Sequence, residues 1–151
     1  MEKAAADTGC TSHFIKDRLI QNETHHVPIN VRQPDGTCFK SNSKGEIPLH
    51  KDLPYSARTA HGFKNIKTNL LSVGQFCDAG CTAIFDKEKC EIRRNNNILL
   101  RGDREKRNGL WYIPLYTSEG APLLTKVSKP TQYISSYEGA KTIGGECNNL
   151  H

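Results

Sequence analysis

The sequence predicts an all-β domain, with an antiparallel, barrel-like sheet, one short helix and a weakly ordered C-terminal tail. Three observations lead to this prediction. A chain of 151 residues with 36% hydrophobic and only 7% aromatic side chains can bury one modest core. Its 12 glycines and 7 prolines suit a loop-rich β protein better than a helical bundle. Short alternating apolar runs, separated by turn residues, follow one another along most of the chain.

The first half of the chain predicts a short strand and then hairpins. Residues 1–9 are expected to form a strand that ends in a turn. Val27, Ile29 and Val31 would share one face of a strand, Pro-Asp-Gly at 34–36 is a turn signal, and residues 38–41 resume an extended pattern. The polar stretch SNSKGE at 41–46 predicts the mobile tip of a hairpin, because Ile47 and Leu49 follow it at strand spacing.

The second half predicts a strand that leads into a short helix and then four more strands. Leu70, Leu71, Val73 and Phe76 suit the strand and helix, and Gly80 is a helix stop. Residues 81–102 indicate three strands separated by an acidic-basic turn and an Asn-rich turn. GLWYIPLY at 109–116 predicts one more strand, which ends at Pro114 or soon after. From about residue 117 the pattern fades, which predicts a flexible tail.

The net charge is +5, and the basic side chains are densest at residues 91–109. A solvated hairpin rim is the preferred interpretation, because no aromatic residues are interleaved with the charges. A weak contact with nucleic acid stays open as the other interpretation. It would use five arginines, which are Arg93, Arg94, Arg101, Arg104 and Arg107. Neither a signal peptide nor a membrane-spanning run is recognisable, so we expect no membrane partner.

The tripeptide Asp7-Thr8-Gly9 is the main candidate for chemistry. Glycine lets another backbone approach closely, and the threonine hydroxyl can fix the direction of the acid. One carboxylate cannot hydrolyse a peptide alone, whereas two that share a proton can. A second Asp-Thr-Gly is missing from the sequence, so the second acid would come from another copy of the chain in a symmetric dimer. Taken alone, the tripeptide is better explained as a β-turn.

A wider set of motifs favours the catalytic interpretation. DTGCTSHF at 7–14, NLLSVGQFCDAGCTAIFDKEKCEI at 69–92 and ILLRGDREKRNGLWYIPL at 98–115 occur in order. Together they resemble the protease region of a copia-type retrotransposon polyprotein. The resemblance implies a retropepsin-like barrel and three parts of the chain. These are a protease core at 1–76, a β-rich extension at 77–116 that is similar to the protease–integrase linker, and the tail at 117–151.

The resemblance also implies roles for individual residues. It makes Asp7 the catalytic acid, with Thr8 and Gly9 completing the active-site loop. It further implies a homodimer that cuts its own polyprotein in or beside a cytoplasmic virus-like particle, with no cofactor and no metal. The remaining residues that it assigns are the flap tip, Ser43, Lys44 and Gly45, and the supports of the loop, Leu70, Leu71 and Ser72.

The sequence is also compatible with three alternatives to this interpretation. Only six residues precede Asp7, which leaves open an inactive transposon-derived β module that acts as a spacer or an interaction domain. A zinc site at Cys77, Cys81 and Cys90 is disfavoured, because the spacing lacks the paired pattern of structural zinc sites. Catalysis by Cys10 with His13 as its base is also disfavoured, because no third group to orient the base is visible.

Overall fold

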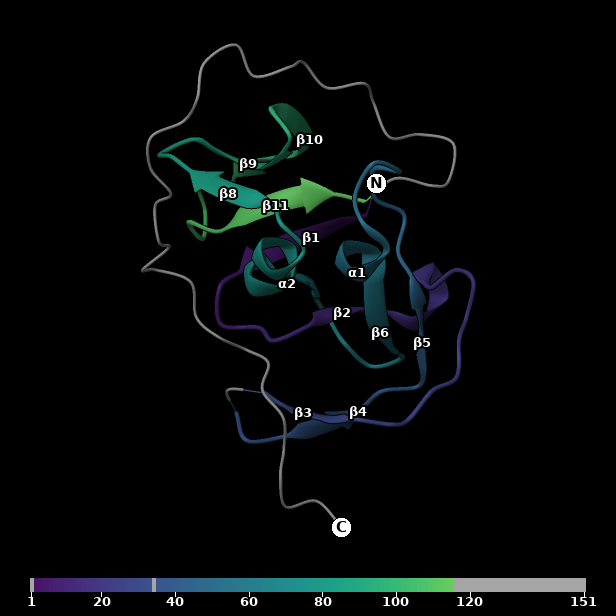
Figure 1. Cartoon of the computed structure of the whole chain (residues 1–151). Helices are drawn as coiled ribbons and strands as arrows, with labels where there is room; N and C mark the ends of the chain where they lie inside the picture. The colour runs from purple at the N-terminus through teal and green to yellow at the C-terminus, as the bar shows by residue number, and fades with distance from the viewer. Residues whose placement is uncertain (1, 34, 116–151) are drawn as a thin grey trace.

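The computed structural model describes residues 2–33 and 35–115 and is mostly β-structure (Figure 1). The predicted tail at 117–151 lies outside the described residues. Two short α-helices and one 3-10 helix accompany the strands. In chain order the elements are β1 Lys3–Asp7, β2 His13–Lys16, η1 Asp17–Leu19, β3 Asn30–Arg32, β4 Cys38–Lys40, β5 Ser43–Glu46, α1 Tyr55–Arg58, β6 Thr59–Phe63, β7 Asn69–Ser72, α2 Val73–Asp78, β8 Thr82–Phe85, β9 Lys89–Arg94, β10 Asn97–Arg104 and β11 Trp111–Pro114.

Nine of the strands form one sheet in the order β5-β6-β2-β7-β1-β11-β10-β9-β8. The sheet is mixed, because β1 pairs with β7 and β2 pairs with β6 in parallel, while the other pairs are antiparallel. Its two edge strands, β5 and β8, do not pair with each other, so the sheet is open. The all-β class is therefore confirmed, whereas the prediction of an antiparallel sheet with a single helix was wrong.

The sheet buries a different group of side chains on each face. On one face, Ala57 of α1 and Phe76 of α2 pack with Ala4 and Ala6 of β1. On the other face, the two-stranded β3–β4 hairpin covers the sheet, and Val31 packs there with residues that include Ala5. Figure 1 shows α1 and α2 beside the sheet and the β3–β4 hairpin at the bottom of the view. Strand β1 is thus central and is covered on both faces.

The turns follow from residues that tolerate positive φ. Gly36, in the β3–β4 turn, has φ 90°, and Gly80 ends α2 with φ 87°. Asn95 and Asn96 both adopt positive φ between β9 and β10, which suits a two-residue hairpin turn. The predicted helix stop at Gly80, the predicted turn, at its described residues Asp35 and Gly36, and the Asn-rich turn are therefore confirmed.

The prediction of a hairpin tip at SNSKGE was wrong. Ser43, Lys44 and Gly45 lie in β5, which pairs with β6 along its whole length. Residues 21–24 cover the outer edge of β5, since the Gln21 amide donates to the Glu46 carbonyl over 2.8 Å and the Thr24 amide donates to the Lys44 carbonyl over 2.9 Å. The hairpin in this region is β3–β4, so Ser43, Lys44 and Gly45 do not form a flap tip.

Candidate active site

Asp7 is the last residue of β1, in the middle of the sheet. Ala4 and Ala6 point to the helix face and Ala5 to the hairpin face, so strand alternation directs Asp7 to the hairpin face. Asp7 is buried, with 3% of its surface exposed, while Thr8 and Gly9 beyond it are exposed. The predicted strand and turn at residues 1–9 are therefore confirmed, with the acid at their junction.

The carboxylate of Asp7 has a defined orientation. The Gly9 amide donates a 2.8 Å hydrogen bond to Oδ1 of Asp7, which is the turn that an aspartate forms with the backbone two residues ahead. Cys10 is buried nearby and donates from Sγ to the Ser12 carbonyl over 3.0 Å. Burial, and then the charge of Asp7, raise the pKa of the Cys10 thiol to about 12. Cys10 therefore stays a thiol, and its pKa responds to the charge of Asp7.

His13, at the end of the loop that follows Asp7, forms a hydrogen bond through each ring nitrogen. The Ser72 amide donates to Nδ1 over 2.8 Å, which makes Nε2 the protonated nitrogen that donates to the Ala57 carbonyl over 2.8 Å. The ring is fully buried and packs 4.7 Å from the ring of Phe76. Burial lowers the pKa of His13 to about 4, although the Ala57 carbonyl opposes the shift. Neither nitrogen is available as a base, which argues against the Cys10–His13 alternative.

Ser72 and Gln75 complete this polar network at the end of the sheet. The Ser72 hydroxyl donates to the Cys10 carbonyl over 2.6 Å and accepts from the Gln75 amide over 3.0 Å, so it caps α2 and anchors the loop together. The Gln75 side chain accepts from the His13 amide over 2.9 Å and donates to the Thr59 carbonyl over 2.8 Å. The backbone that follows Thr8-Gly9 is thereby fixed at the Cys10 carbonyl and the His13 amide.

The predicted supports Leu70, Leu71 and Ser72 lie directly beside the loop strand. In the parallel pairing of β1 and β7, Leu70 is opposite Ala5, Leu71 is opposite Ala6, and Ser72 is opposite Asp7. The two leucines are buried on opposite faces of the sheet. The structure therefore brings these three residues and Asp7 together, whereas Ser43, Lys44 and Gly45 lie four strands away from β1 in the sheet.

Sequence reasoning missed the structural roles of His13 and Gln75. In the sequence, His13 stands out only as a disfavoured base for Cys10, and Gln75 lies within the second motif without a predicted role. Both are polar residues directly before a phenylalanine, and polar groups that are buried beside apolar side chains need partners. That mismatch with the apolar pattern is the signal that could have identified them.

The arginines proposed for nucleic-acid contact are mostly paired within the protein. Arg93 and Arg101 both donate to the buried carboxylate of Glu91, the latter over 3.0 Å. Burial opposes the ionisation of Glu91, but these two arginines outweigh it and hold the pKa of that carboxyl below its usual value. Arg107 pairs with Glu105 over 2.8 Å. Part of the basic charge is therefore neutralised locally.

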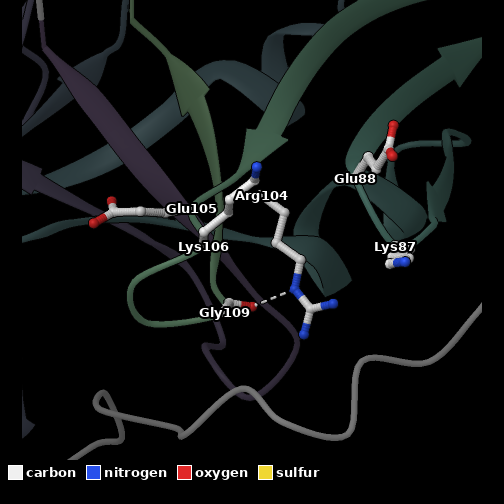
Figure 2. A pocket seen from close by; sticks show the side chains of 6 residues that line it. All are labelled: Lys87, Glu88, Arg104, Glu105, Lys106 and Gly109. Atoms are coloured by element: carbon white, nitrogen blue, oxygen red, sulfur yellow. Dashed lines mark hydrogen bonds between the residues drawn. The ribbon is translucent and has the colours of Figure 1, made fainter.

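Arg104 lies in a pocket of about 740 Å³ at one end of the sheet. Figure 2 shows its Nε donating to the Gly109 carbonyl, a bond of 2.9 Å, with Lys87 across the pocket. The guanidinium also lies 4.3 Å from the ring of Trp111. Glu88 and Glu105 line the same pocket, so its charge is mixed.

Other candidate chemistry is weakly supported in the part of the chain that the structure describes. No group of three or more His, Cys, Asp or Glu side chains there could hold a metal ion. The pKa values of Cys77 and Cys81 are raised, mainly by burial, so neither thiol is activated. No described helix combines the length and apolar character needed to span a bilayer.

Comparisons with known proteins found no match among protein-family models, curated proteins or solved structures.

Proposed function

We propose that the chain is a retropepsin-like aspartic endopeptidase, of the kind found in copia-type retrotransposon polyproteins, that acts as a homodimer. The observation that carries the proposal is the buried network around the Asp7 loop. Side chains from two distant motifs, His13 from the first and Ser72 and Gln75 from the second, meet at this loop, and each bonds to a backbone group of the other motif. Burying so many polar groups is tolerated only when each finds a partner. The network gives Asp7 the rigid support that catalysis requires.

Asp7 from each of two chains would supply the chemistry. At short separation only one of the two carboxyl groups ionises, so the pair holds one proton. The ionised carboxylate takes a proton from the attacking water, while the protonated one polarises the scissile carbonyl. Thr8 and Gly9 are exposed, so a second chain would approach along them to reach the buried carboxyl group of Asp7.

The β3–β4 hairpin is the better candidate for a flap. It packs over the hairpin face, which is the face toward which strand alternation directs Asp7. Its turn residues Asp35, Gly36 and Thr37 are exposed, while Val31 at its base is buried. A short hairpin with an anchored base and an exposed turn suits a cover for an extended peptide.

Peptide cleavage tests the proposal directly. Peptides from the junctions of the parent polyprotein are incubated at mildly acidic pH with the wild type and with Asp7→Asn. The expected loss of rate is at least about 100-fold, because the variant lacks the proton-transferring group. Asp103→Asn, which removes an exposed carboxylate on β10, is the control and retains the wild-type rate. Equal rates for the wild type and Asp7→Asn reject the mechanism.

One observation favours a second candidate, a non-enzymatic β module. Only 3% of the surface of Asp7 is exposed, which is low for a group that must meet a partner and a substrate. Such a module would act as a spacer or bind nucleic acid through its arginines. The internal pairing of Arg93, Arg101 and Arg107 weakens the nucleic-acid version. Nucleic-acid affinity that falls steeply with salt, in a monomer without proteolysis, would support it.

A further inference from the structure

A second pocket adjoins the candidate active-site loop. Its volume is about 240 Å³, and Thr11 and Ser12, which connect Cys10 to β2, form one wall. Its other walls include Lys44 of β5, His61 of β6 and Asp78 of α2. Asp7 does not line it. The pocket nevertheless lies at the sheet end where the loop is anchored, since Gln75 also lines it.

His61, one of the residues that line this pocket, has an unsatisfied polar atom. Its Nδ1 is buried and has no hydrogen-bond partner among the residues that the structure describes. Buried polar atoms in folded proteins nearly always have a partner, and a ligand is one way to supply it. The rest of the His61 ring packs near Phe14, at a centroid distance of 6.3 Å. The ring is thus held in place while one nitrogen is unpaired.

The charge around His61 favours an anion. Lys44 is directly opposite His61 in the pairing of β5 with β6, so the two side chains share a face of the sheet. Lys44 forms no ion pair within residues 2–33 and 35–115. Burial, and then the charges of Lys44 and His26, lower the pKa of His61. Asp78 enters the pocket from α2 and is not among the charges that shift this pKa.

We propose that this pocket binds a carboxylate side chain, glutamate or aspartate, of a peptide substrate. The carboxylate oxygens would accept hydrogen bonds from Lys44 Nζ and from His61 Nδ1, with the hydroxyl groups of Thr11 and Ser12 close by. Describing the ligand as part of a substrate rests on the proposed function. Binding of the carboxylate itself does not depend on catalysis.

Peptide affinity measured in the Asp7→Asn background tests this inference without cleavage. The probes are the capped peptides Ala-Ala-Glu-Ala-Ala and Ala-Ala-Gln-Ala-Ala, titrated by NMR while the His61 ring resonances are followed. The glutamate peptide is expected to bind about tenfold more tightly, because a hydrogen bond to an ionised group is stronger than one to an amide. Lys44→Gln should remove this preference, and His61 should shift only when the glutamate peptide binds.

Lys64→Gln is the matched control, because Lys64 carries the same charge, is exposed and does not line the pocket. It should keep the tenfold preference. Equal affinities for the two peptides, no binding of either at millimolar concentration, or a preference that survives Lys44→Gln would overturn the inference. Cleavage by the wild type is assayed separately. Carboxylate binding without cleavage would reject the protease function and support carboxylate binding in the pocket. Cleavage without a carboxylate preference would support the protease function and reject carboxylate binding in the pocket.

Discussion

At the scale of single residues, His13 and Ser72 hold the loop after Asp7 in place. Each makes two hydrogen bonds from a fully buried position, and together they connect the loop after Asp7 to β7, α1 and α2. Such buried groups are costly when they lose a partner, because the remaining partner stays buried and unsatisfied. Substitution of His13 or Ser72 should therefore disturb the conformation of the Asp7 loop as much as a substitution within the loop itself.

The lowered pKa of His13 predicts that stability falls in mild acid. The unfolded chain protonates this group near its ordinary pKa of 6.5, whereas the folded protein resists until about 4. The unfolded state thus gains protons first, and stability declines from about pH 6.5 to 4, by up to about 3 kcal/mol. Urea unfolding across this range should show a shallower decline for His13→Gln. Parallel pH profiles for the two proteins would contradict the assignment.

Ser72→Ala removes the anchor of the Cys10 carbonyl and the cap of α2 in one step. We expect a loss of about 2 kcal/mol in the free energy of unfolding. Thr68→Ala is the control, because Thr68 is a half-exposed hydroxyl residue just before β7, and its substitution should cost less than about 0.5 kcal/mol. Urea unfolding at neutral pH measures both. Equal losses would show that the Ser72 hydroxyl has no special role.

At the element scale, β5 is the strand whose position the sequence failed to reveal. Gly45 resembles a turn glycine in SNSKGE, yet its role is close packing: a Cβ there would lie 2.5 Å from the Gln21 carbonyl oxygen and 2.7 Å from Ile20 Cγ2. The need for a bare backbone comes from residues 20–24, which are distant in sequence. Local turn signals cannot distinguish this reason for glycine from a hairpin tip.

A pair of glycine substitutions tests this explanation of β5. Gly45→Ala should destabilise the protein by about 1–3 kcal/mol, because residues 20–21 must move to admit the methyl group. Gly74→Ala places the same methyl group on α2, where the nearest atom is 3.7 Å away, and should be neutral or stabilising by up to about 1 kcal/mol. Thermal unfolding of the two variants provides the comparison. A neutral Gly45→Ala would mean that residues 20–24 do not cover β5.

The elements with local signals were the ones that could be predicted from the sequence. Strands β8, β9 and β10 follow one another through short turns, and Asn95-Asn96 marks one of these turns directly. The helix α2 has a serine cap and a glycine stop. By contrast, α1 spans only Tyr55–Arg58 and has neither signal, since Pro54 at its N-cap forms no side-chain cap bond. It was not predicted.

At the scale of the whole molecule, the parallel pairs that make the sheet mixed could not be predicted from the sequence. The parallel pairs join β1 to β7 and β2 to β6, and these strands are separated by most of the first half of the chain. Pairing between such distant strands leaves no local pattern, so an antiparallel sheet was the natural prediction. The same pairing brings Asp7 beside Ser72, and therefore only the structure connects the two motifs physically.

The central claim is that two copies of Asp7 make one site, and subunit mixing tests it most directly. Wild-type and Asp7→Asn chains are refolded together at constant total concentration, and the peptide-cleavage rate is measured against the wild-type fraction. A shared site requires wild-type chains on both sides of the two-fold axis. The rate should then follow the square of that fraction and fall to about one quarter in an equal mixture. A linear decline to about one half would mean that each chain acts alone, and it would contradict the account.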